Sequence, residues 1–141
     1  MTTTTVKIES PVASISKGRL WTARIMSGLV IAFMLVDSIF KFIPNEQVTA
    51  GTVDLGYQPH HIPVMGTLAF ISTLLFIISR TQILGLILLT GYFGGAIATH
   101  VRLDNPLFSH ILFPVYLAVL AWGSVYLKNE TVRRLIPLKK Q

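Results

Sequence analysis

Four long apolar runs, separated by short polar stretches, constrain this chain more than any other feature of its sequence. They cover residues 20–42, 62–78, 82–99 and 107–127. A helix needs roughly 20 mostly apolar residues to cross the roughly 30 Å hydrocarbon layer of a membrane. Each run is therefore expected to form one spanning helix. The predicted fold class is all-α, a four-helix transmembrane bundle.

A soluble four-helix bundle is the rival interpretation, and the outward faces of the runs argue against it. A soluble helix carries a polar stripe opposite its core, but residues 74–78 and 83–89 offer no such stripe. The composition points the same way, because 52% of the residues are hydrophobic and only 13% are charged. That balance is unusual for a soluble domain of this length.

The chain divides into a single transmembrane domain between two polar tails. Residues 1–16 form a polar, Thr-rich tail without the apolar core of a removable signal peptide. Residues 17–128 hold the four spans, and residues 129–141 form a basic tail. The connection at 43–59 is long enough for a short interfacial helix or a re-entrant cap.

The basic residues predict the orientation of the spans. Cytoplasmic segments are enriched in Lys and Arg, and a four-span arrangement puts ten basic residues on one side and only Lys41 and Arg102 on the other. Both termini are therefore expected in the cytoplasm, in a multi-pass protein of a bacterial cell (inner) membrane. The lipid bilayer then explains the net charge of +6, and no nucleic-acid partner is predicted. The ten are Lys7, Lys17, Arg19, Arg24, Arg80, Lys128, Arg133, Arg134, Lys139 and Lys140.

The chain contains no cysteine. This excludes disulfides, thiol catalysis, thiolate-ligated iron–sulfur clusters and covalently attached c-type haem. Any redox role must therefore use a bound cofactor.

Away from the cytoplasmic flanks, the ionisable residues gather toward the predicted outer end. Asp37 and Lys41 are the most informative, because the i, i+4 spacing places them one turn apart on one helix face. Asp37 lies about 25 Å along the first helix from Leu20, within the hydrocarbon or at its margin. Two interpretations stay open: a self-neutralising ion pair, or an acid poised to exchange a proton with a ligand.

Small residues mark one face of the third run. Gly91, Gly94, Gly95 and Ala98 allow a neighbouring helix to approach closely, so this face is expected to pack inside the bundle. A Gly95→Leu substitution should then destabilise the protein. Arg102 continues this face, which makes it a candidate donor to Asp37 or to a ligand.

All four histidines lie on the predicted outer side, and three are candidate ligand contacts. His100 points nearly opposite Gly91, so it shares a site with Arg102 only if the helix unwinds around Thr99. His110 falls on an inward face of the fourth run, whose Pro114 is expected to kink the helix. His61 lies where the connection meets the second run. No metal is predicted, because the chain has no local ligand motif such as H-x-x-x-H or H-E-x-x-H.

The order of these features resembles the DoxX-like family of small four-helix membrane proteins. The matching segments are DSIFKFIP at 37–44, LGY at 55–57 and GGAIATHVR at 94–102. The third is the most specific, and the resemblance extends from about Ser16 to Lys128. It implies the same four-helix bundle that the apolar runs predict.

The resemblance implies a function only loosely. The family takes its name from relatives of the DoxD subunit of thiosulfate:quinone oxidoreductase, and other members are linked to membrane redox assemblies. Thiosulfate chemistry does not carry over to a chain without cysteine. The leading hypothesis is a quinone-linked or redox-associated membrane component, with a polar pocket formed by Asp37, Lys41 and Arg102 as catalytic candidates. Its partners would be a lipophilic ligand, with quinone as the candidate cofactor, or a membrane redox protein.

Two further classes stay open. One is a stand-alone membrane enzyme that performs acid–base chemistry on a lipophilic substrate. The other is a non-catalytic assembly or carrier protein. The sequence does not decide whether the protein is an enzyme.

Overall fold

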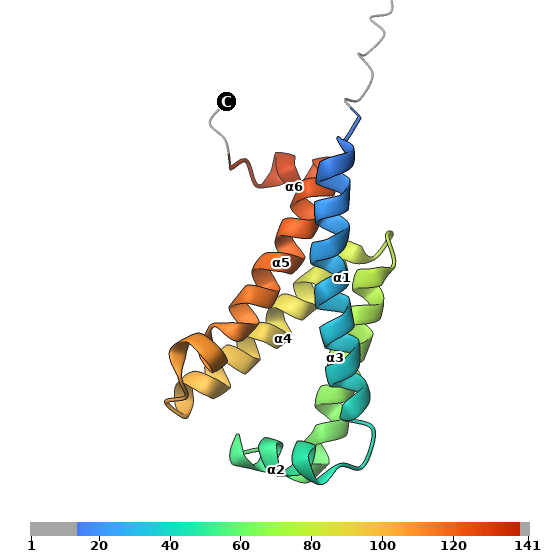
Figure 1. Cartoon of the computed structure of the whole chain (residues 1–141). Coiled ribbons are helices and arrows are strands. Elements are labelled where there is room, and N and C mark those ends of the chain that lie inside the picture. The colour runs from blue at the N-terminus through green and yellow to red at the C-terminus, as the bar shows by residue number, and fades with distance from the viewer. Residues whose placement is uncertain (1–13, 139–141) are drawn as a thin grey trace, which may run out of the picture.

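The computed structural model describes residues 14–138, and these residues form helices and contain no strand. The N-terminal tail up to residue 13 and residues 139–141 lie outside the described part. The elements are α1 (Lys17–Phe40), α2 (Glu46–Asp54), the 3₁₀ turn η1 (Pro59–His61), α3 (Ile62–Ile77), α4 (Gln82–Arg102), the π-helical turn η2 (Leu107–Ile111), α5 (Phe113–Lys128) and α6 (Glu130–Leu135). Figure 1 shows their arrangement.

Within residues 14–138, four helical segments are long and apolar enough to cross a membrane. Their outward faces carry large apolar side chains, among them Leu29 at 56% exposure, Val64 at 57% and Val119 at 62%. A contiguous apolar exterior of this kind marks a surface that meets lipid rather than water. The predicted all-α, four-helix transmembrane fold is confirmed.

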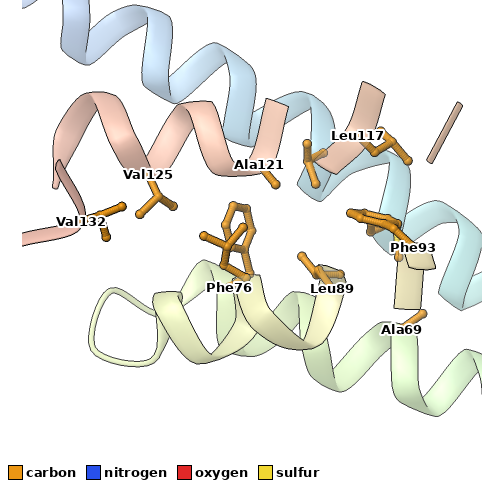
Figure 2. Packing of buried hydrophobic residues seen from close by; sticks show 11 residues of the cluster. Ala69, Phe76, Leu89, Phe93, Leu117, Ala121, Val125 and Val132 are labelled. Carbon is orange, nitrogen blue, oxygen red and sulfur yellow. The ribbon is translucent and has the colours of Figure 1, made fainter. Parts of the chain in front are cut away.

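The spanning helices pack in a ring in which each contacts two neighbours. The order around the ring is α1, α3, α4 and α5, and α5 closes it against α1. The buried core lies toward the end of the bundle that holds the α3–α4 turn. Figure 2 shows Phe76 pointing from α3 toward Ala121 and Val125 of α5, with Leu89 of α4 beside it.

Helices α3 and α4 approach each other closely beside the short turn that joins them. A Cβ atom on Gly85 would collide with the backbone of Phe76, so only glycine fits there. Membrane helices commonly use small residues in this way to bring backbones together.

The glycine face predicted to pack inside the bundle does not do so. A Cβ atom added at Gly91, Gly94 or Gly95 would meet nothing within 4 Å. In Figure 1, α4 runs with α5 and moves away from α3 as it leaves their shared turn. The expectation that Gly95→Leu would destabilise the protein through lost packing is therefore wrong, because no helix lies against this face.

The connection between α1 and α3 forms α2, which lies across the far end of the bundle (Figure 1). Asn45 begins this helix, and its side-chain oxygen accepts hydrogen bonds from the backbone N–H groups of Gln47 at 2.8 Å and Val48 at 3.4 Å. Asparagine is among the most effective residues at this position. We refer to this part of the molecule as the α2 end.

The fourth span is divided rather than continuous. Residues 107–111 form a π-helical turn, and α5 begins only at Phe113. Pro114 has no backbone N–H to donate to the preceding turn, which explains the break at this point. Beyond Lys128, the segment expected to be a basic tail turns into α6, and its Val132 is buried in the core.

Candidate functional site

A cavity of about 720 Å³ lies at the α2 end, where α3 and α4 have separated. Its walls come from α1, α2, α3 and α4, and α5 takes no part. Phe40, Met65, Leu68 and Leu88 contribute apolar surface. The polar groups on its walls include Asp37, Lys41, Gln47, Tyr92, Thr99 and His100.

Asp37 and Lys41 form an ion pair on the cavity wall. Lys41 Nζ lies 2.5 Å from Asp37 Oδ1 and 3.5 Å from the Asp37 carbonyl oxygen. The lysine side chain is 13% exposed and the aspartate side chain 31%. Gly66 of α3 leaves room for the lysine stem, because a Cβ atom there would come within 2.9 Å of Lys41 Cβ. The more exposed carboxylate is thus the member of the pair that a ligand reaches more easily.

Tyr57 and Thr99 join the α2 connection to α4. The two hydroxyl oxygens are 2.6 Å apart, and the Thr99 hydroxyl lies 2.9 Å from the carbonyl oxygen of Gly95. Because threonine has one hydroxyl proton and gives it to Gly95, Tyr57 must be the donor to Thr99. Its own oxygen remains available as an acceptor at the edge of the cavity.

Arg102 has a different role from the one expected of it. Its guanidinium is exposed and donates to the carbonyl oxygen of Leu55 at 2.8 Å, and it is not among the residues that line the cavity. Gly56 lies beneath it with φ +84°, and a Cβ there would come within 2.8 Å of Arg102 Nη2. Arg102 therefore attaches the end of α2 to α4, and only glycine suits the turn that receives it.

His100 lines the cavity although α4 stays helical through Thr99 to Arg102. Sequence reasoning required the helix to unwind around Thr99 for His100 and Arg102 to share one site. It does not unwind, and only His100 of the two lines the cavity. His100 Nδ1 lies 2.8 Å from Asn105 Nδ2. An amide nitrogen only donates, so Nδ1 is the acceptor and the proton of the neutral ring sits on Nε2.

His110 and His61 lie outside this cavity. His110 is exposed on the π-helical turn, where its Nδ1 lies 2.7 Å from Ser109 Oγ, and its ring centre is 5.5 Å from that of His100. It lines a second pocket, of about 490 Å³. His61 accepts a hydrogen bond from the Gln58 backbone N–H at 3.1 Å, so it stabilises the turn into α3.

Tyr57, Tyr92 and Thr99 are site residues that sequence reasoning missed. Tyr92 lines the same cavity as Asp37. A signal existed, because Tyr92, Gly95 and Thr99 share one face of a helix at i, i+3 and i+7. Glycine on such a face predicts helix packing. The hydroxyl groups of Tyr92 and Thr99 on the same face instead predict a ligand site.

The arrangement is suited to holding a lipophilic molecule by a polar head. The Asp37 carboxylate accepts hydrogen bonds, while Lys41, Tyr92 and His100 have donors. Within residues 14–138, no three His, Asp or Glu side chains gather closely enough to hold a metal ion.

Two of the segments that carried the family resemblance meet at this site. LGY at 55–57 contacts GGAIATHVR at 94–102 through the bonds from Arg102 to Leu55 and from Tyr57 to Thr99. The third segment holds Asp37 and Lys41.

Comparison with known proteins gives one family. No curated protein matches the chain, and no solved structure does. The model of the DoxX-like family matches residues 25–124, which is more than half of the chain and includes all four spans in large part. The protein therefore belongs to the DoxX-like family.

Proposed function

We propose that the protein binds a lipophilic molecule with a compact polar head, of the quinone class, and acts as a quinone-linked or redox-associated component of the membrane. The cavity carries this proposal. Sites for small molecules are mostly apolar concavities of about 300–1,000 Å³ with a few placed polar groups. The cavity of about 720 Å³ fits that description.

A quinone suits both the polar donors and the bare glycine backbone of the cavity wall. Its ring carbonyls would accept hydrogen bonds from Lys41, Tyr92 or His100. A flat ring would lie against the bare backbone at Gly91 and Gly95, where no side chain from any other described helix intervenes.

The apolar rim supports entry from the bilayer. Leu68 of α3 is 56% exposed and Leu88 of α4 is 41% exposed, yet both line the cavity. A prenyl or alkyl tail passing between these helices would stay in hydrocarbon while the head reached the polar groups. On the charge argument, the protein lies in the cytoplasmic membrane of a bacterium, with both termini in the cytoplasm and the α2 end outside.

A membrane enzyme with acid–base chemistry is the second candidate. It is favoured by the partial exposure of Asp37 on the cavity wall, since a carboxylate beside a bound substrate can take a proton from it. A non-catalytic carrier would use the same cavity without that step.

Neighbouring glycines of α4 provide a matched test. A Cβ atom added to Gly94 or to Gly95 would have no other group within 4 Å, but only Gly95 lines the cavity. Gly95→Leu should keep the thermal stability of the protein and reduce binding of decylubiquinone at least tenfold. Gly94→Leu should leave both unchanged.

The measurement is equilibrium binding of decylubiquinone to the protein in nanodiscs, with mass spectrometry of lipids retained after gentle detergent extraction. Equal binding by wild type and Gly95→Leu would contradict a ligand in this cavity. Absence of binding by wild type, with no retained lipophilic molecule, would reject the quinone class.

A further inference from the structure

The main cavity and the second pocket share a wall. Gly51, Leu55 and His100 line both. The remaining lining of the second pocket is Asp54, Leu103, Asn105 and His110. Asp54, Leu103 and His110 are exposed, so this pocket faces the surroundings at the α2 end. Among the described residues, His100 is the one titratable group common to both spaces.

We infer that His100 carries protons between the polar head of a ligand in the cavity and the water of the second pocket. This role rests on the proposed function and adds to it a route by which the head exchanges protons at the α2 end. When a membrane redox protein reduces a quinone bound in the cavity, that protein supplies two electrons, and two protons must reach the ring oxygens. Oxidation of the quinol returns both electrons and both protons, and His100 provides the route for the protons. His is the side chain whose ordinary pKa best suits this exchange near neutral pH.

Asn105 allows His100 to change its protonation state without losing its support. In the neutral ring, Nδ1 accepts from the amide nitrogen of Asn105 at 2.8 Å. In the charged ring, Nδ1 becomes a donor, and the same amide turned by half a rotation offers its oxygen instead. The charged ring carries one proton on each nitrogen. After Nδ1 has gained a proton from one side, Nε2 can therefore release its own proton to the other side, and Asn105 supports Nδ1 before and after the change.

His110 provides the next group on the pocket side. Its ring centre lies 5.5 Å from that of His100 in an edge-to-face arrangement, so the two rings are in direct contact. Ser109 orients the His110 ring through a 2.7 Å contact with Nδ1. Besides His100, the titratable and charged groups that line either space are Asp37, Lys41, Asp54, Tyr57, Tyr92 and His110.

The test uses a probe whose colour reports its own protonation. A 2-hydroxy-3-alkyl-1,4-naphthoquinone changes its visible absorbance when its acidic hydroxyl ionises. The probe is bound to the protein in nanodiscs, the pH is changed by stopped-flow mixing, and the rate of the absorbance change is recorded. Dilution into probe-free nanodiscs gives the dissociation rate, which separates protonation of bound probe from protonation of released probe.

Replacement of His100 should slow protonation of the bound probe at least tenfold. His100→Gln keeps a polar partner for Asn105 but does not titrate, and His100→Phe removes both properties. Each variant is compared at a probe concentration that saturates it, so that the rate is measured per bound probe, and both should be slow. His60→Phe is the control, because His60 is exposed and lines neither space. Free imidazole added to His100→Ala should restore part of the lost rate.

The outcomes separate the two claims. Binding with unchanged protonation rates in the His100 variants would overturn the proton route and leave the proposed function standing. No binding of the probe or of decylubiquinone to wild type would overturn the proposed function, and the proton route with it. An equal slowing in His60→Phe would also overturn the assignment to His100.

Discussion

At the scale of single residues, the Asp37 carboxylate faces Lys41 on one side and the cavity on the other. Lys41 neutralises it at 2.5 Å, while the cavity leaves 31% of its side chain exposed. If the ion pair serves only to stabilise the fold, removal of both charges together should leave the protein nearly as stable as before. Removal of one member of a buried pair leaves an uncompensated charge, whereas removal of both does not.

This distinction gives a prediction for Asp37→Asn and Lys41→Met. Each single replacement should reduce stability by about 1–3 kcal/mol, less than for a fully buried pair because Asp37 is partly exposed. If the pair is structural and the ligand is held by Tyr92 and His100 rather than by Lys41, the double replacement should restore both stability and ligand retention. If Asp37 contacts the ligand, Asp37→Asn should lose the ligand and the double variant should not regain it.

The measurement is a double-mutant cycle, with thermal unfolding in detergent and the amount of bound decylubiquinone determined for all four proteins. Recovery of stability together with full ligand binding in the double variant would reject a ligand-binding role for Asp37.

At the scale of helices, α3 and α4 pack closely beside their shared turn. Gly85 lies against the Phe76 backbone beside their turn, and Gly94, farther along α4, has no neighbour within 4 Å of the place a Cβ atom would take. One helix therefore holds a glycine that packing requires and a glycine that packing does not require.

We expect Gly85→Ala to destabilise the protein by about 1–3 kcal/mol, since the added methyl group must push two backbones apart. Gly94→Ala should be neutral or slightly stabilising, because alanine favours a helix more than glycine does. Thermal unfolding of both variants in the same detergent provides the comparison. Equal midpoints for Gly85→Ala and wild type would contradict the close approach seen here.

The apolar runs were sufficient to predict these helices, because length and hydrophobicity are properties of each segment by itself. Two other predictions from the sequence, helix packing at Gly95 and an inward donor role for Arg102, do not match the structure. Small-residue spacing shows that a helix face is bare but does not say whether a helix or a cavity lies against it. The Arg102 side chain has a partner on a segment 47 positions away, and no local pattern identifies such a pairing. Asp37, Lys41 and His100 do line the cavity, and the sequence singles them out only because ionisable groups within a span are rare.

At the scale of the whole molecule, both ends of the described chain lie at the end of the bundle opposite α2 (Figure 1). Arg19 of α1 contacts the α5 end there, donating to the carbonyl oxygen of Leu127 at 2.8 Å. On the charge argument made for the proposed function, a reporter fused after Gln141 should read the cytoplasmic side, and one inserted at Pro44, in the exposed link between α1 and α2, should read the outer side.

The full chain is retained in the first fusion because Val132 belongs to the core, and truncation after Lys128 would expose that core. Activity of an alkaline phosphatase reporter and fluorescence of a green fluorescent protein reporter distinguish the two sides. The same side for both positions would contradict a four-span topology.

Because α3 and α4 pack closely at Gly85, a small change in the angle between them there displaces the far end of α4 by a larger amount. Gly85 and Thr99 are separated by 14 positions along α4, or about 21 Å at 1.5 Å per residue. A rotation of only about 3° at the pivot would displace the far end by about 1 Å, by simple trigonometry on that helical length. A change of about 1 Å in the gap between α3 and α4 at the α2 end therefore requires no backbone hydrogen bond within either helix to break.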